Sequence, residues 1–115
     1  MQEMIISLDW EYLNDLLEHI DDCLIRSGFP TILRMRAQML VEELFQALMQ
    51  TDDVDRTKIR CTQPDQKTIL LQYRSPNGAV APDVSMIEML INAGIAYGVK
   101  AQFAEASCTL TIGEK

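Results

Sequence analysis

Apolar residues recur at helical spacing in three stretches of the chain, which predicts three amphipathic helices. The first stretch follows Asp9, a residue suited to cap a helix, and stops at Gly28, which suits a left-handed helix end. The second helix is expected over residues 31–50, and the third over residues 83–97 with Asp83 as its cap. The buried side of the second helix is predicted to contain Leu33, Leu40, Val41, Leu44, Phe45, Leu48 and Met49.

Other stretches alternate apolar and polar residues, as strands do when only one face of the sheet is buried. A short apolar run over residues 4–8 predicts an edge strand. Residues 57–73 and residues 99–112 each contain two alternating segments around a turn, which predicts two antiparallel hairpins. Residues 74–82 are expected to form a loop, because they are rich in Pro and Gly. Residues 51–55 are expected to form a solvated acidic turn, since they lack the ligand spacing of a calcium loop.

The predicted elements follow the order β-α-α-β-β-α-β-β within a single domain that covers residues 1–115. Helices and strands that each carry one apolar face bury those faces against one another. The expected fold is therefore α+β, a two-layer α/β sandwich with a mostly antiparallel sheet and three helices on one face.

Composition and charge narrow the choice of partner. Ten basic and seventeen acidic residues give a net charge of −7, and no basic cluster along the sequence offsets it. This argues against nucleic acid and against an anionic membrane, because both attract concentrated Lys and Arg. No apolar run approaches the ~20 residues that span a bilayer, and no signal peptide is recognisable at the N-terminus. A cytoplasmic location is expected.

The residues most often found in metal and catalytic sites are sparse. Cys23, Cys61 and Cys108 are far apart without metal-ligand spacing, so we expect free, buried thiols in a reducing compartment and no metal site. His19 is the only histidine and lies on an acidic helix with no Cys, Ser or second His close to it in sequence. We assign it no role. The acidic face of that first helix, formed by Glu11, Asp15, Glu18 and Asp22, is expected to be solvated.

The middle of the second helix reads Leu40-Val41-Glu42-Glu43-Leu44-Phe45-Gln46-Ala47-Leu48. Together with the order of elements, this stretch resembles the histidine-kinase-like (GHKL) ATPase domain, whose sandwich is of the Bergerat type. The compact branch of anti-sigma factors and serine protein kinases is the most similar. The resemblance covers nearly the whole chain, up to the closing segment 107–112.

The first motif of that family is Glu-x-x-x-Asn on the second helix. Its Glu orients or deprotonates the nucleophile and its Asn coordinates the Mg²⁺ that bridges the phosphates. The apolar pattern aligns Glu43 with the Glu and Ala47 with the Asn, and Ala has no oxygen to offer Mg²⁺. Ala47 is instead expected to belong to the core with Leu40, Leu44 and Leu48. An alternative register pairs Glu42 with Gln46, whose amide could coordinate the metal.

The other two motifs have also diverged. The family's Asp-x-Gly-x-x-Phe-Asp-Pro box, which reads adenine, aligns Ser75 with its first Asp, Asn77 with its Gly and Pro82 with its Pro. Asn tolerates a left-handed backbone, so the turn is expected to survive although the adenine acceptor is lost. The family's Gly-rich phosphate cradle aligns with residues 84–90, which contain no glycine.

The resemblance and the lost motifs together imply a non-catalytic regulatory module that binds another protein. By resemblance the partner is a sigma-factor-like or antagonist-like regulator, a homodimer is an option, and no cofactor is expected. The alternative is an ATP-binding serine protein kinase or ATPase with bound Mg²⁺. Its atypical site would use Glu43, as the only catalytic candidate, with Gln46, Ser75 and Asn77. A third option is a small ligand in the former nucleotide cleft.

Overall fold

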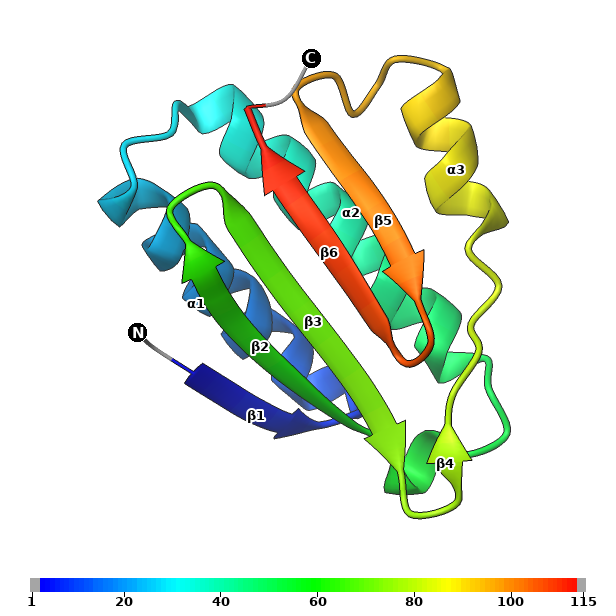
Figure 1. Ribbon diagram of the computed structural model, residues 1–115. Coiled ribbons are helices and arrows are strands. Elements are labelled where there is room, and N and C mark those ends of the chain that lie inside the picture. The colour runs from blue at the N-terminus through cyan, green and yellow to red at the C-terminus, as the bar shows by residue number, and fades with distance from the viewer. Residues whose placement is uncertain (1–2, 114–115) are drawn as a thin grey trace.

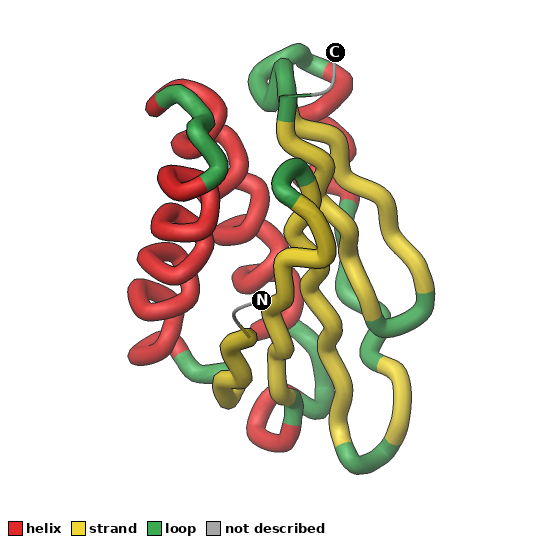
Figure 2. The backbone as a smooth tube through the Cα atoms, turned by 60° about the vertical axis from the view of Figure 1, so that its left-hand side comes forward, coloured by secondary structure: helices red, strands yellow, loops and turns green. Residues whose placement is uncertain are grey.

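Helices α1 and α2 form one layer of the protein and an open antiparallel sheet forms the other, as Figures 1 and 2 show for the computed structural model, which describes residues 3–113. The helices are α1 (Leu13–Arg26), α2 (Thr31–Met49) and α3 (Ser85–Asn92), with short 3-10 turns at Trp10–Tyr12 and Val54–Arg56. The strands are β1 (Glu3–Ser7), β2 (Lys58–Asp65), β3 (Thr68–Ser75), β4 (Gly78–Ala79), β5 (Val99–Ala104) and β6 (Ser107–Ile112).

The sheet has the order β1-β2-β3-β6-β5, and β4 pairs with the end of β3. Every pairing between these strands is antiparallel. The predicted α+β fold is confirmed, and the element order differs from the prediction only by the additional strand β4. Among the described residues, no helix is both long enough and apolar enough to cross a bilayer.

Local hydrogen bonds and backbone geometry determine where helix α1 begins and ends. The Asp9 carboxylate accepts a hydrogen bond from the Glu11 N–H at 3.1 Å, so it caps a 3-10 turn, and α1 itself starts only at Leu13. At the other end Gly28 has φ = +82°, and the Phe29 N–H donates to the Leu24 carbonyl at 3.1 Å. This is the left-handed helix end that the sequence predicts.

Helix α3 is shorter than the predicted helix over residues 83–97. It ends at Asn92 because Gly94 adopts φ = +75° and the Ile95 N–H donates to the Leu90 carbonyl at 3.1 Å. The remainder, residues 93–98, forms turns. The predicted cap was wrong by one residue, because Val84 is the N-cap of α3. The Asp83 carboxylate, one residue earlier, accepts a hydrogen bond from the Ser85 N–H at 3.0 Å.

The predicted loop over residues 74–82 instead begins with a small hairpin. Ser75-Pro76-Asn77-Gly78 matches the residue preferences of a type I turn, and β4 then returns antiparallel to β3. The left-handed residue in this turn is Gly78, with φ = +115°. The expected turn is present, but Asn77 is not its left-handed residue, because Ala106 is the only described residue other than glycine with positive φ.

The hydrophobic core lies between α1, α2 and the inner face of the sheet. The alternation in the first predicted hairpin is confirmed, since Ile59, Cys61, Ile69, Leu71 and Tyr73 are all buried. The three cysteines are buried and free, as expected. The predicted acidic face of α1 is exposed along its length. The fold therefore follows from the periodicity, and the differences lie at the ends of elements.

Candidate functional site

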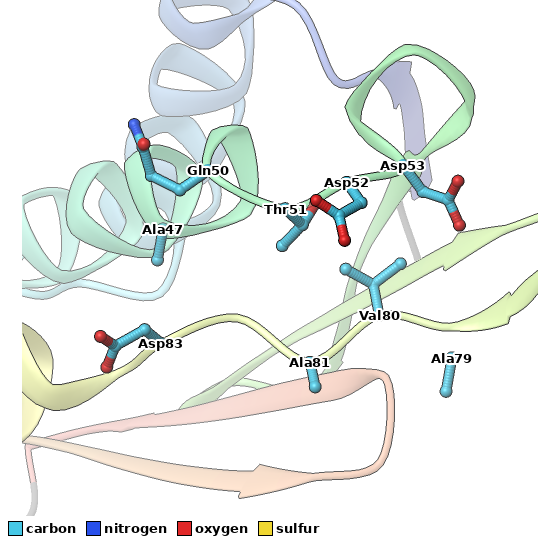
Figure 3. Close-up of a pocket in the computed structure, with 9 residues that line it drawn as sticks. All are labelled: Ala47, Gln50, Thr51, Asp52, Asp53, Ala79, Val80, Ala81 and Asp83. Carbon is cyan, nitrogen blue, oxygen red and sulfur yellow. The ribbon is translucent and has the colours of Figure 1, made fainter.

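A cavity of about 400 Å³ lies beside the C-terminal end of α2, between the loop that follows this helix and the segment that joins β4 to α3 (Figure 3). We call it the acidic cavity. It is lined by Ala47, Gln50, Thr51, Asp52, Asp53, Ala79, Val80, Ala81 and Asp83. The Ala47 methyl points toward the segment that carries Asp83, whereas the Gln50 amide points away from that segment (Figure 3).

The charge of the acidic cavity is entirely negative. Asp52, Asp53 and Asp83 line it, and no Lys, Arg or His is among its lining residues. The hydrogen bonds that the Asp83 carboxylate accepts from the Ser85 hydroxyl and N–H hold the pKa of Asp83 below its usual value. Asp83 is therefore ionised at neutral pH. A phosphate entering this cavity would meet carboxylates and no compensating cation.

Ser75 and Asn77, two of the residues predicted to contact a nucleotide, are brought together by the β3–β4 turn and both bind Asp53. The Ser75 hydroxyl donates to Oδ2 of Asp53 at 3.0 Å, and the Asn77 amide donates to Oδ1 at 3.2 Å. Ser75 Oγ also accepts from the Asn77 N–H at 3.2 Å. The polar groups available to read a base are thus already satisfied by this chain's own carboxylate.

Hydrogen bonds within the chain hold the loop after α2, which was expected to be a solvated acidic turn. The Thr57 side chain is buried and its hydroxyl donates to the Asp53 carbonyl at 2.7 Å. Thr51 donates to the Leu48 carbonyl, also at 2.7 Å. The expectation for residues 51–55 therefore holds for Asp52 and Asp55, which are exposed, and was wrong for Asp53.

The remaining candidates lie on α2, outside the lining of the acidic cavity. Glu43 is half-buried one turn before Ala47, while Glu42 and Gln46 are exposed. Ala47 was expected to belong to the core with Leu40, Leu44 and Leu48, but it is only half-buried and lines the cavity. At Ala47, helix α2 therefore presents a methyl group to the acidic cavity.

Within residues 3–113 no group of three or more His, Cys, Asp or Glu side chains is arranged to hold a metal ion. His19 lies 3.9 Å from the Cys23 sulfur, and partial burial lowers the pKa of His19, so its imidazole is neutral at physiological pH. Burial raises the pKa of the Cys61 and Cys108 thiols to about 12, which leaves both protonated and unreactive.

A second feature of the surface was not anticipated from the sequence. Met86 and Met89 on α3, and Ile95 and Tyr97 in the turns that follow it, are each about half exposed, at 49%, 54%, 50% and 56%. We call these four residues the α3 apolar surface. Ile87 on the inner side of α3 is buried, and Ser85, Glu88 and Asn92 form its exposed polar side. Met86 and Met89 lie outside the buried side, so they leave apolar side chains in water.

The turns after α3 are fixed to the first half of α2. The Arg36 guanidinium lies 5.9 Å from the centre of the Tyr97 ring and donates a hydrogen bond to the Tyr97 carbonyl. Ile32 and Met35, which neighbour this contact in sequence, are exposed as well. Apolar side chains thus gather at the end of the molecule where α2 begins and α3 ends. Gathered exposed apolar residues commonly mark an interaction surface.

No protein-family model and no curated protein matches this chain.

Proposed function

We propose that this chain is a non-catalytic regulatory module that binds another protein, on a scaffold resembling the histidine-kinase-like ATPase domain without a working ATP site. The observation that carries the proposal is the lining of the acidic cavity. It contains three carboxylates and no cation, and it includes Ala47, the residue aligned with the family's metal ligand.

The expected loss of ATP affinity is large. A metal ligand, an adenine acceptor and a glycine-rich phosphate cradle are each worth ~1–3 kcal/mol when present. Every 1.4 kcal/mol is a factor of ten in affinity, so a micromolar site would become millimolar or weaker. Electrostatic repulsion between the ATP phosphates and the carboxylates of Asp52, Asp53 and Asp83 would lower the affinity further.

The protein-binding half of the proposal is supported by the α3 apolar surface, where four large apolar side chains on one helix and the turns after it are each about half exposed. The resemblance suggests a sigma-factor-like or antagonist-like regulator as partner, with a homodimer as a further option. A cytoplasmic location is part of the proposal and agrees with three free, buried thiols.

Isothermal titration calorimetry with Mg-ATP tests the first half. At millimolar nucleotide we expect no saturable heat. Saturable binding in the micromolar range that is abolished by Glu43→Ala would favour the alternative, an atypical kinase or ATPase. Glu18→Ala is the control, since it removes an exposed carboxylate of α1 that belongs to neither register of the candidate site.

Affinity capture from the source cell, followed by mass spectrometry, tests the second half. The bait is the wild-type chain or the double variant Met86→Glu/Met89→Glu, and Glu88→Gln serves as a control on the same helix. We expect at least one protein that the wild type and the control retain and the double variant loses. The same set of proteins on all three baits would argue against the α3 apolar surface as the binding site.

A further inference from the structure

The uncovered face of the sheet carries a basic hollow that the sequence alone does not reveal. In the view of Figure 1, β1, β2 and β3 lie in front of α1 and α2 with no described element in front of them. A depression of about 190 Å³ on these strands is lined by Ile5, Lys58, Arg60, Gln72 and Arg74. These five residues define the basic hollow.

The strand register brings the cations together. Lys58 on β2 is the direct cross-strand partner of Arg74 on β3, and Arg60 is the partner of both Ile5 and Gln72. Both side chains of a cross-strand pair project from the same face, so two positive charges stand opposite each other. Residues sixteen positions apart in sequence therefore form one cluster, which is why the chain shows no basic run.

The cluster is only partly neutralised. The Arg60 Nε–H donates to the Glu3 carboxylate at 2.8 Å, so this cation has a partner on the edge strand. Neither Lys58 nor Arg74 forms an ion pair with a carboxylate of residues 3–113. Like charges placed directly opposite each other destabilise a sheet. Lys58 and Arg74 are therefore the two cations of the hollow that an anionic ligand would neutralise.

We propose that the basic hollow binds the carboxylates of an acidic segment of a partner protein, with Lys58 and Arg74 as the contacting cations. The proposal rests on the protein-binding function proposed above and names the chemistry of one contact. Ile5 is 58% exposed at the margin of the hollow, so it offers an apolar contact beside the charges. A volume of about 190 Å³ corresponds to roughly six water molecules at ~30 Å³ each, which is room for carboxylate side chains.

Charge and size favour a protein segment over nucleic acid. A nucleic acid presents a long row of phosphates and needs a matching basic stripe. Beyond the hollow, the outward positions of β6 are Ser107, Thr109 and Thr111, which carry no charge. The next cation on this face is Lys100 on β5, which β6 separates from β3, so the cations do not form a continuous stripe. A short acidic segment requires only the local cluster. It would also be repelled less than a long polyanion by the acidic remainder of the protein.

The experiment is fluorescence anisotropy with a fluorescein-labelled peptide of repeated Glu-Glu-Leu units, and with a Gln-Gln-Leu peptide as control. We expect saturable binding of the acidic peptide only, weakening as salt is raised. Arg74→Glu and Lys58→Glu should each reduce affinity by about tenfold or more. Lys67→Glu makes the same charge change at the far turn of the β2–β3 hairpin and should leave affinity within about twofold.

Each other outcome overturns the proposal. Equal losses for Arg74→Glu and Lys67→Glu would mean that only net charge matters. Displacement of the peptide by inorganic phosphate, but not by sulfate or chloride at equal ionic strength, would assign the hollow to a phosphate group. Tighter binding of single-stranded oligothymidylate, lost in Arg74→Glu, would assign it to nucleic acid. Absence of peptide binding would refute the hollow as a carboxylate site and leave the capture experiment at α3 unaffected.

Discussion

The Ser75 hydroxyl donates a hydrogen bond over 3.0 Å to Oδ2 of Asp53, which ties the turn between β3 and β4 to the loop that follows α2. Asn77 adds a second hydrogen bond to the same carboxylate. The internal acid thus accepts the two side-chain donors that the family resemblance would assign to an adenine base. Both donors are therefore engaged within the chain.

Replacing Asp53 should loosen this connection. Asp53→Ala removes the acceptor of both hydrogen bonds and leaves the half-buried Ser75 hydroxyl with only the longer hydrogen bond to the Gly78 carbonyl, at 3.4 Å. Hydrogen bonds to a charged group are worth more than neutral ones, and partial exposure reduces their value here. We expect the free energy of unfolding to fall by about 1–2 kcal/mol, measured by urea denaturation.

Asp52→Ala is the matched control, because Asp52 is exposed in the same loop and lines the same acidic cavity. Its effect should stay within about 0.5 kcal/mol. Equal losses for the two variants would mean that the loop responds to total charge and that the Asp53 hydrogen bonds contribute little.

The fold was predictable where periodicity is strong, and the errors have local causes. The long helix α2 and the two hairpins carry clear apolar patterns, so their existence and type were predicted correctly. Strand β4 has two residues, Gly78 and Ala79, which is too short to show any period. Helix α3 was overextended because Ile95 continues its apolar spacing although Gly94 ends the helix.

The candidate site was less predictable than the fold, because it depends on residues far apart in sequence. Asp53 belongs to the loop after α2, and only the folded chain brings it to Ser75, twenty-two positions later. The basic hollow likewise depends on the pairing of Lys58 with Arg74. Basic residues are not clustered along the sequence, but the fold brings Lys58 and Arg74 together. Pairing register would have to be known before either contact could be predicted.

The two glycines after α3 should differ in their tolerance of substitution. Both have positive φ, +75° at Gly94 and +90° at Gly98, so alanine is strained at either position. A Cβ at Gly94 meets nothing within 4 Å, whereas at Gly98 it would lie 2.4 Å from Cδ2 of Leu33. We expect Gly98→Ala to destabilise by about 1 kcal/mol more than Gly94→Ala, because the Leu33 side chain must shift.

Thermal unfolding followed by circular dichroism measures this difference. Similar melting temperatures for both variants would show that Leu33 moves aside at no cost. The turns after α3 would then be less firmly held against α2 than the contacts of Gly98 and Arg36 suggest.

Alkaline pH should destabilise the protein through its buried thiols. Burial raises the pKa of Cys61 and Cys108 to about 12, while an unfolded cysteine titrates near ~8.5. Between these values the unfolded chain releases the proton and the folded chain keeps it. The stabilisation is therefore complete below about pH 8.5 and is lost as the pH rises toward about 12.

Cys108→Ala tests the pH dependence, because it removes one of these thiols. The variant should be less stable than the wild type at neutral pH, since it leaves a small cavity in the core. The difference between the two proteins should narrow by about 1–2 kcal/mol from about pH 8.5 to about pH 10 in urea denaturation. A constant difference across this range would mean that the folded thiol titrates near its ordinary pKa.

Two substitutions on α3 separate packing from recognition. Ile87 is 2% exposed and Met89 is 54% exposed, although both are large apolar residues on one short helix. Ile87→Ala should lower the free energy of unfolding by about 2–4 kcal/mol, because it opens a cavity in the core. Met89→Glu should change it by no more than about 0.5 kcal/mol. A large loss of stability in Met89→Glu would show that this side chain packs within the chain, which would weaken its assignment to a binding surface.

The opposed cations of the basic hollow lead to a prediction that needs no ligand. Lys58 and Arg74 are direct cross-strand partners, and neither has a carboxylate partner within residues 3–113. Lys58→Gln keeps a long polar side chain and removes one of the two charges, so it should raise the free energy of unfolding by about 0.2–1 kcal/mol at low ionic strength. The gain should shrink as salt is added, because salt screens exposed charges.

Lys67→Gln removes one positive charge from the turn of the same hairpin and is the control for net charge. Since the chain is acidic overall, this loss of a cation should be neutral or slightly destabilising. If Lys58→Gln also lowers the free energy of unfolding, Lys58 and Arg74 do not repel each other across the strands. The hollow would then contain no excess positive charge for an anionic ligand to neutralise. Lys58→Gln would support the proposal if it raises the free energy of unfolding and also lowers the affinity for the acidic peptide. The same two cations would then destabilise the sheet and bind the ligand.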